Sequence, residues 1–213
     1  MSREMLPAGG ASGTEGYGAE AAVLAVRYER LVFEQVHADV LHLMPAPPAH
    51  VLDIGAGTGR DAAAFARLGH RVVAAEPTAE LRAHGERLHA HTQITWIGDA
   101  LPDLAVLRER AQRFDLVMLT AVWMHLDAAQ RRRAMPALAA LVAPGGRAIM
   151  SLRHGPVPSG RRMFEVGAAE TTALADASGL ATLTCFPRAD HQGRPSVSWT
   201  VLALERPASP IRR

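Results

Sequence analysis

The sequence contains no lysine, so all 23 basic residues among its 213 are arginine. Against 21 acidic residues they leave a net charge of +2, and the basic runs at 131–133 and 161–162 are too short to predict nucleic-acid binding. A single cysteine, Cys185, excludes an internal disulfide framework. No apolar run reaches the ~18 residues of a membrane-spanning helix. Residues 1–18 lack the apolar core of a secretion signal, so we expect a cytoplasmic protein without membrane contact.

The order of the apolar segments predicts a single α/β domain. Strands are expected at residues 50–54, 71–76, 93–97, 114–120 and 147–152, with helical segments between them. Strands that alternate with helices pair in parallel through right-handed crossovers. The last two strands, at 181–187 and 196–204, have no helix between them and predict an antiparallel hairpin. The expected fold is Rossmann-like: a doubly wound, seven-stranded mixed sheet with an antiparallel C-terminal hairpin.

This domain is expected to span residues 19–206. Residues 1–18, which are rich in glycine, serine and alanine, predict a flexible N-terminal arm, and residues 207–213 predict a C-terminal tail. Between residues 19 and 44 apolar and charged residues recur at helical spacing, until Pro45 ends the pattern. We expect this N-terminal helix to fold over the ligand site as a lid.

A glycine-rich turn directly follows the first expected strand. Residues 51–61 read VLDIGAGTGRD, so apolar strand residues run into three glycines and then into a helix start. Glycine permits close approach of a ligand, and the helix start presents free N–H groups and the positive end of a dipole. Glu76 ends the second strand about 20 residues after Gly55, where an acidic residue can accept hydrogen bonds from two ribose hydroxyls. Together these features predict a ribonucleoside ligand with a second, anionic end.

Two ligand classes compete at this turn. A dinucleotide site has the spacing GxGxxG, whereas this chain has GxGxG and carries Arg60 at the position of the last glycine. An arginine at that position crowds a pyrophosphate at the helix start. Asp53, before Gly55, would repel a pyrophosphate but can accept a hydrogen bond from an ammonium group. These features favour S-adenosylmethionine, which carries ribose, an amino group and a carboxylate, over NAD.

Several segments, in order along the chain, resemble the motifs of the class I S-adenosylmethionine-dependent methyltransferases. VLDIGAGTG is similar to the first motif, VVAAEP to the second, WIGDALPD to the third and FDLVMLTAVWMHL to the fourth. LVAPGGRAIMSL resembles the segment that leads into the fifth strand, so the resemblance covers roughly residues 50–152. It implies methyl transfer from S-adenosylmethionine, with S-adenosylhomocysteine as product, by an enzyme of the small-molecule type.

The resemblance also implies which residues contact the cofactor. The cofactor would run along the glycine turn, made by Gly55, Ala56 and Gly57. Its methionyl end would contact three further residues: Asp53, Thr120 and Ala121. Glu76 would bind the ribose hydroxyls, with Pro77 beside the adenosine. The adenine would lie against the loop after the third strand, at Asp99, Ala100 and Leu101.

The segments after the fourth and fifth strands carry the candidates for chemistry. Methyl transfer is an in-line displacement, so alignment is the main task, and a general base is needed only for a protonated acceptor. His125 is the first candidate base because imidazole titrates near neutral pH, and His154 is the second. Either histidine could instead be structural. Trp123 either walls the acceptor pocket or anchors its loop in the core.

Arginines after the fifth strand predict an anionic acceptor. Arg153 and either Arg161 or Arg162 lie in a polar loop at the carboxyl edge of the sheet, where specificity residues concentrate. A guanidinium pairs with carboxylate or phosphate through a planar fork, although a solvated or internal ion pair would explain the same residues. Tyr28 is a further candidate for acceptor binding, and Tyr17 or Tyr28 could reach the cofactor. The scattered histidines and the lone cysteine predict no metal site.

The sequence therefore predicts a methyltransferase that transfers a methyl group from S-adenosylmethionine to an N or O nucleophile of a small, anion-bearing molecule. The alternatives are a tRNA or protein methyltransferase, an NAD-dependent oxidoreductase and a non-catalytic S-adenosylmethionine-binding module. A nucleic-acid amino methyltransferase is disfavoured, because that group carries an Asn/Asp-Pro-Pro-aromatic box where this chain has TAVW at 120–123. We expect a monomer or a homodimer.

Overall fold

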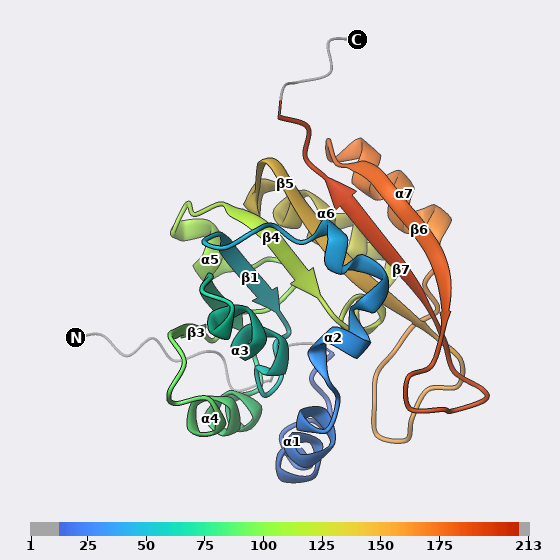
Figure 1. The fold of residues 1–213 in the computed structure, drawn as a ribbon. Helices are drawn as coiled ribbons and strands as arrows, with labels where there is room; N and C mark the ends of the chain where they lie inside the picture. Colours follow the sequence, from blue (N-terminus) through green and yellow to red (C-terminus); the bar gives the residue numbers. More distant parts are fainter. Residues whose placement is uncertain (1–12, 209–213) are drawn as a thin grey trace.

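A mixed seven-stranded sheet forms the centre of the protein (Figure 1). The structure is a computed structural model that describes residues 13–208. The sheet has the strand order β3-β2-β1-β4-β5-β7-β6. Its strands are β1 (His50–Ile54), β2 (Arg71–Ala75), β3 (Ile94–Ile97), β4 (Phe114–Leu119), β5 (Val142–His154), β6 (Ala181–Ala189) and β7 (Ser198–Glu205). Strands β1 to β5 pair in parallel, and β7 lies antiparallel between β5 and β6. The predicted Rossmann-like fold with an antiparallel C-terminal hairpin is confirmed.

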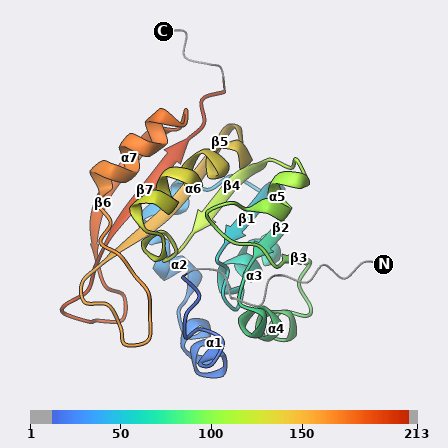
Figure 2. The same cartoon turned by 180° about the vertical axis from the view of Figure 1, so that it is seen from behind.

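Helices cover both faces of this sheet. They are α1 (Ala21–Glu29), α2 (Phe33–Val36), the 3₁₀ helix η1 (Ala38–Leu43), α3 (Arg60–Arg67), α4 (Ala79–Leu88), α5 (Ala105–Glu109), the 3₁₀ helix η2 (Trp123–His125), α6 (Ala128–Leu141) and α7 (Ala168–Ala177). One core cluster joins the sheet to α2, η1 and α3, and the other joins it to α5, α6 and α7. Figures 1 and 2 show these two helix layers from opposite sides. No helix in the described part of the chain is long and apolar enough to cross a membrane.

The topology fixes where a ligand can bind. After β1 the chain builds β2 and β3 on one side and then returns to form β4 on the other side of β1. The strand order therefore reverses between β1 and β4, and ligands of open α/β sheets bind at the carboxyl ends of the strands beside such a reversal. In Figure 1, α1, the β5–α7 loop and the β6–β7 loop all lie at the end toward which the β1 and β4 arrows point.

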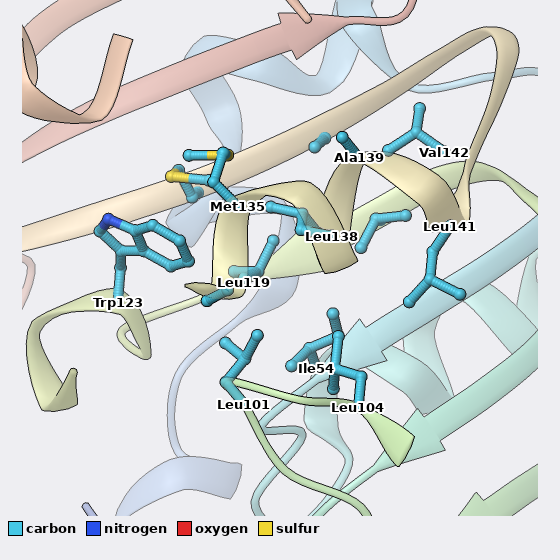
Figure 3. Close-up of a cluster of buried hydrophobic side chains, with 14 of the residues drawn as sticks. Ile54, Leu101, Leu104, Leu119, Trp123, Met135, Leu138, Ala139, Leu141 and Val142 are labelled. Carbon is cyan, nitrogen blue, oxygen red and sulfur yellow. The ribbon is translucent and has the colours of Figure 1, made fainter. Parts of the chain in front are cut away.

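The core cluster that joins the sheet to α5, α6 and α7 also holds the segment that follows β4. Trp123 packs there with side chains of β4 and α6, among them Leu119, Met135 and Leu138 (Figure 3). Burying each large apolar side chain of this kind contributes about 1.5–3 kcal/mol relative to leaving it exposed. The turn that follows β4 is therefore anchored in the core.

The N-terminal helix predicted across residues 19–44 is wrong as a single element. The structure has three short helices there, because Val32 adopts an extended conformation between α1 and α2. This break lets Phe33 pack against Phe65 of α3, with ring centroids 5.0 Å apart. Tertiary packing thus overrides the local helical pattern.

Two further boundaries differ from the expectation. Pro144, Gly145 and Gly146 were expected to lie before the fifth strand, but β5 begins at Val142, directly after α6. The register between β4 and β5 shifts at this point, so the three residues are accommodated in an irregular strand start.

Residues 13–18, part of the predicted flexible arm, form turns beside the site described next. The rest of the arm lies outside the described residues.

Candidate functional site

A cavity of about 340 Å³ lies at the carboxyl ends of β1, β4 and β5. Its walls come from the glycine turn after β1, the segment from residue 13 through α1, the residues that follow β4 and β5, and the β6–β7 loop. A cavity of this size is within the range of small-ligand sites, about 300–1,000 Å³. It is therefore the candidate site for the ligand that the glycine turn predicts.

The glycine turn lines this cavity with backbone atoms that carry no side chain. Gly55 and Gly57 have φ angles of 67° and 59°, in the left-handed region that favours glycine. A Cβ on Gly55 would lie 2.6 Å from Cγ2 of Val122, in the loop after β4. A side chain at Gly55 would therefore clash with another wall of the same cavity. α3 begins at Arg60, so the free N–H groups of its first turn follow the glycines.

Two backbone N–H groups hold the carboxylate of Glu76 after β2. The N–H of Gly57 donates to Oε2 at 2.8 Å, and the N–H of Thr78 donates to Oε1 at 2.7 Å. The carboxylate is buried, and burial raises its pKa although these hydrogen bonds oppose the shift. The hydroxyl of Thr78 also bonds this carboxylate, and the remaining acceptor capacity can still serve a diol in the cavity.

Asp99 is fixed in a similar way after β3. Its Oδ1 accepts from the N–H of Ala100 and its Oδ2 from the N–H of Leu107, both at 2.9 Å. The carboxylate lines the cavity together with Ala100, Leu101 and Pro77. Asp99 thus shapes the loop before α5, as a turn-capping residue would, and its remaining acceptor positions can serve a ligand.

A buried carboxylate, Asp61, ties three elements together beside the cavity. It accepts hydrogen bonds from Nε of Arg60 at 2.7 Å, from Nε2 of His37 at 2.9 Å and from the hydroxyl of Thr120 at 2.9 Å. Burial opposes ionisation of this group, but the attraction of His37 and Arg60 is stronger and holds the pKa of Asp61 well below its usual range. The network joins the start of α3 to the residue after α2 and to the end of β4.

Asp53 of β1 lies close to this network and lines the cavity. Burial first, and then the charge of Asp61, raises the pKa of Asp53 well above its usual range, while Arg60 opposes the shift. A positive group beside a carboxyl favours its ionised form. Asp53 is therefore suited to pair with an ammonium group that enters the cavity.

The imidazole of His125 lies between a backbone carbonyl and a phenol. Nδ1 is 2.8 Å from the carbonyl oxygen of Arg162, and Nε2 is 3.0 Å from the hydroxyl of Tyr17. A carbonyl can only accept, so we assign the proton to Nδ1, and the neutral Nε2 accepts from Tyr17. Burial lowers the pKa of His125, although the Arg162 carbonyl opposes this shift. His125 and Tyr17 both line the cavity.

Arg161 fastens the segment before α1 to the loop after β5. Its Cζ lies 4.3 Å from the centroid of the Tyr17 ring, and its Nη2 pairs with Glu20 at 2.6 Å. Tyr28 takes a different position, because its ring lies against Gly57 of the glycine turn. Burial raises the pKa of Tyr17 and Tyr28, so both phenols stay protonated near neutral pH.

Two arginines that line the cavity form no ion pair with a carboxylate of residues 13–208. Arg153 of β5 is 9% exposed, and its one hydrogen bond to these residues runs from Nη1 to the carbonyl oxygen of Gly155 at 3.4 Å. Arg188 of β6 donates from Nη1 to the carbonyl oxygen of Val36 at 2.6 Å, and its buried Nε has no partner among the described residues. Burial lowers the pKa of both side chains, but a guanidinium remains charged in proteins. These residues give the cavity uncompensated positive charge.

The β6–β7 loop contains an internal ion pair. Asp190 accepts from Nε and Nη2 of Arg194, at 2.9 and 2.7 Å, and from Nε1 of Trp199 at 2.9 Å. The Arg194 hydrogen bond is the main reason that the pKa of Asp190 is well below its usual range. The carboxylate of Asp190 is therefore already bonded to Arg194 and Trp199. The sequence did not single out the cavity-lining residues of this region, which are Arg188, Asp190, His191, Gln192, Arg194 and Trp199.

Two predicted site residues, Trp123 and His154, are not among the residues that line the cavity, in keeping with the structural alternative that the sequence left open for each. Trp123 is 0% exposed, because its large apolar ring packs in the core against α6 (Figure 3). It therefore anchors its loop and does not wall the acceptor pocket. His154 follows Arg153 on β5, and successive strand residues point to opposite faces of the sheet. Its Nε2 lies 2.8 Å from the hydroxyl of Thr200 on β7, and it is not placed to act as a base in the cavity.

The structure brings the other predicted site residues together around the cavity. From the cofactor set these are Asp53, Gly55, Ala56, Gly57, Glu76, Pro77, Asp99, Ala100, Leu101, Thr120 and Ala121. From the catalytic and acceptor sets they are Tyr28, His125, Arg153 and Arg161. Within the part of the chain that the structure describes, no group of three or more His, Cys, Asp or Glu side chains could hold a metal ion.

The chain is similar to methyltransferases in sequence pattern and in fold. Residues 51–146 match a family described as a methyltransferase domain. Magnesium protoporphyrin IX methyltransferase from Synechocystis PCC 6803, solved with bound S-adenosylhomocysteine, superposes with a TM-score of 0.70 at 14% identity, over 91% of this chain and 96% of that one. The N-methyltransferase NodS from Bradyrhizobium japonicum WM9 gives a TM-score of 0.65 at 18% identity, over 82% and 97%.

A third structure of the same fold is the 1,6-didemethyltoxoflavin-N1-methyltransferase from Burkholderia thailandensis. It gives a TM-score of 0.60 at 21% identity and covers 97% of this chain and 93% of that one. No curated protein sequence matches the chain. Because the identities are low, these structures bear on the fold, and the family assignment comes from the sequence match. The matched residues, 51–146, carry a class I S-adenosylmethionine-dependent methyltransferase domain.

The residues present fit S-adenosylmethionine. The backbone at Gly55 leaves no space for a Cβ, Glu76 has acceptor positions left for a ribose diol, and Asp53 is suited to an ammonium group. When bound, this cofactor supplies an electrophilic methyl group on a sulfonium. Gly55 and Glu76 would suit any ribonucleoside ligand, and Asp53 favours the ammonium group of S-adenosylmethionine over the pyrophosphate of a dinucleotide.

Proposed function

We propose that this methyltransferase acts on an N or O nucleophile of a small molecule that carries an acidic group. The observation that carries the proposal is Arg153, which lines the cavity at 9% exposure and has no carboxylate partner among residues 13–208. A buried charge is costly unless an opposite charge pairs with it. The planar fork of a guanidinium fits a carboxylate or a phosphate, so an acidic acceptor would supply the missing partner.

The structures of similar fold support a small acceptor. One of them is named for magnesium protoporphyrin IX and another for 1,6-didemethyltoxoflavin. Two of the three described above are named as N-methyltransferases. Their names describe those proteins, and for this chain they favour a small molecule over a macromolecule.

We assign the two ends of the cavity to the two reactants. The glycine turn, Glu76 and Asp99 would hold the nucleoside part of the cofactor, and Asp53 with the residues after β4 would hold its methionyl part. Tyr28 lies against the glycine turn and would cover the cofactor. Arg153 and the β6–β7 loop would hold the acceptor.

His125 is the proposed base for an acceptor that arrives protonated. Its Nε2 is already bonded to Tyr17, so the group that meets the acceptor would be the Tyr17 hydroxyl. As the acceptor nucleophile loses its proton to Oη of Tyr17, the phenolic proton passes to Nε2 of His125. The resulting imidazolium keeps its Nδ1 hydrogen bond to the Arg162 carbonyl. A positioned base of this kind contributes about 10²–10⁴-fold to a rate.

The proposal is tested by measuring S-adenosylhomocysteine release with a panel of small hydroxy and amino acids, each paired with its neutral amide. We expect turnover of one or more acids and not of their amides. Arg153→Gln should lower kcat/KM for such an acid by about 10–100-fold, the loss of a charge-assisted hydrogen bond. Arg132→Gln, at an exposed position of α6, is the matched control and should retain activity. Amides that turn over as well as their acids would contradict the proposal.

A tRNA or protein acceptor is the second candidate, and its salt dependence separates it from a metabolite. Binding of a nucleic acid weakens steeply as salt rises, whereas binding of a small acid changes little. The proposal further includes a cytoplasmic location and a monomeric or homodimeric state. Light scattering of the purified protein would measure the latter.

A further inference from the structure

Three residues of the last three strands form a row across the sheet. Arg153 of β5 pairs with Trp199 of β7, and Trp199 pairs with Arg188 of β6. Residues directly opposite each other in antiparallel strands project from the same face. Val201 and Phe186, each two residues from a member of the row, pack in the core cluster of α2, η1 and α3, while Trp199, at the start of β7, also packs against the cluster of α5, α6 and α7. All three side chains line the cavity.

Trp199 lies on the strand between two arginines that form no ion pair among the described residues. Arg153 and Arg188 are bonded to the carbonyl oxygens of Gly155 and Val36, which carry no charge to compensate theirs. Two carboxylates act on these arginines without pairing with them: Asp190, which is already paired with Arg194, and, near Arg188, Asp39, which is exposed to solvent. Adjacent strands lie about 4.8 Å apart, so two strand spacings, roughly 10 Å, separate the backbones that carry the two arginines.

The indole of Trp199 is held in place by its polar atom. Its Nε1 donates to Oδ1 of Asp190 at 2.9 Å, and Asp190 is itself held by Arg194. The ring is half-buried and forms part of the cavity wall. An aromatic face attracts either a cation or another planar ring. The two flanking guanidiniums disfavour a cationic ligand at this place, which leaves a planar ring with an acidic substituent.

We propose that the row Arg153–Trp199–Arg188 is the acceptor subsite and that it selects an aromatic carboxylic acid. The carboxylate pairs with the guanidinium of Arg153, and the ring packs against the indole of Trp199. The Nε of Arg188 is the remaining donor on the other side of the ring. This inference rests on the proposed function, since it specifies which small acid the cavity would receive.

Calorimetry on the protein loaded with S-adenosylhomocysteine tests the subsite without knowledge of the natural acceptor. The probes are benzoate, benzamide, which is planar but neutral, and cyclohexanecarboxylate, which is acidic but not planar. We expect benzoate to bind about 10–100-fold more tightly than benzamide, because a charge-assisted contact is lost. We expect benzoate to bind about 3–10-fold more tightly than cyclohexanecarboxylate, because the aromatic contact is lost.

Three variants assign these preferences to residues. Arg153→Gln should remove the preference for benzoate over benzamide. Trp199→Leu should remove the preference for benzoate over cyclohexanecarboxylate, while Trp199→Phe, which keeps a ring, should retain it. Quenching of tryptophan fluorescence by benzoate should occur in wild type and disappear in Trp199→Phe. Thermal unfolding of each variant, with S-adenosylhomocysteine affinity, confirms that the fold is intact.

Distinct outcomes overturn the inference and the proposed function. The inference is wrong if benzoate fails to bind at about 10 mM, or if it binds no better than cyclohexanecarboxylate. It is also wrong if Trp199→Leu leaves the preference unchanged. If aliphatic acids bind through Arg153 and benzoate has no advantage, the acidic acceptor stands and the aromatic subsite fails. Failure of the wild-type protein to bind S-adenosylhomocysteine would instead contradict the proposed function itself.

Discussion

The hydroxyl oxygen of Tyr17 lies 3.0 Å from Nε2 of His125, whose Nδ1 lies 2.8 Å from the carbonyl oxygen of Arg162. These two contacts fix the tautomer of the ring, because the carbonyl needs a donor and the neutral Nε2 can then only accept. They also engage Nε2 with a phenol from the segment before α1, and both residues line the cavity. Because both ring nitrogens are hydrogen-bonded, a proton from an acceptor would reach His125 through Tyr17.

Tyr17→Phe should raise the pKa of His125. In wild type, burial lowers this pKa, and the Tyr17 hydroxyl donates to the neutral form of the ring. Removing that donor destabilises the neutral form, so protonation becomes easier. Titration of the imidazole by NMR in both proteins measures the effect. The charged or titratable neighbours to monitor are Glu15, Arg153 and Arg161. An unchanged or lower pKa would contradict the assigned tautomer.

The same lowered pKa predicts how His125 affects stability with pH. The unfolded chain binds more protons than the folded one between the folded pKa and about 6.5, so stability rises with pH across that window. The contribution of the neutral ring is fully present above about pH 6.5 and is lost as the pH falls through the folded value. The free energies of unfolding of wild type and His125→Gln, measured with urea, should therefore diverge as pH rises. Parallel curves at all pH values would show that His125 has an unshifted pKa.

Asp61→Asn should destabilise the fold by about 3–5 kcal/mol, the cost of breaking a buried ion pair. The substitution removes the charge that Arg60 and His37 face. Because the pKa of Asp61 is lowered in the fold, its contribution is present above about pH 4 and is lost as the pH falls further. Urea unfolding at neutral pH measures the loss. The matched control is Asp103→Asn, which breaks the exposed pair with Arg133 and should cost about 0–1 kcal/mol. Equal losses in the two variants would argue against the Asp61 network.

Arg153→Gln should leave the ligand-free protein as stable as wild type or more stable, by up to about 2 kcal/mol, since it removes a buried charge that lacks a counter-ion. Arg131 is the matched control. It is 4% exposed and is paired through Nε and Nη2 with both carboxylate oxygens of Glu170, whose side chain is 35% exposed, so Arg131→Gln should cost about 1–3 kcal/mol. Thermal and urea unfolding without ligand measure both. Strong destabilisation by Arg153→Gln would mean that the residue has a structural partner and is not reserved for an acceptor.

The sequence was sufficient for the sheet and for the grouping of the proposed cofactor residues around one cavity. Strands buried on both faces leave strong apolar segments, and the glycine turn and Glu76 lie at fixed places relative to two such strands. The sequence was insufficient where tertiary packing decides. Residues 19–44 carry a helical pattern, but burial of Phe33 against Phe65 breaks the helix.

Register and packing explain the residues of the acceptor half that the sequence did not place. His154 lies on β5, where a shift of one residue exchanges the two faces of the sheet. Trp123 lies in η2, where packing against α6 decides the direction of its ring. Arg188 and Trp199 come from the C-terminal hairpin, far along the chain from the family motifs. The expected C-terminal hairpin could have indicated them, because pairing of this hairpin with the fifth strand would place both residues near Arg153.

The central claim is that the cavity above the glycine turn holds S-adenosylmethionine, with Glu76 on the ribose. Calorimetry of wild type and Glu76→Gln with S-adenosylhomocysteine and with its 2′-deoxy analogue tests it most directly. We predict that wild type binds the complete ligand about 10–100-fold more tightly than the deoxy analogue, as expected for a hydrogen bond to a charged group. We predict that this difference shrinks in Glu76→Gln. An equal preference in the two proteins, or no binding by wild type, would contradict the account.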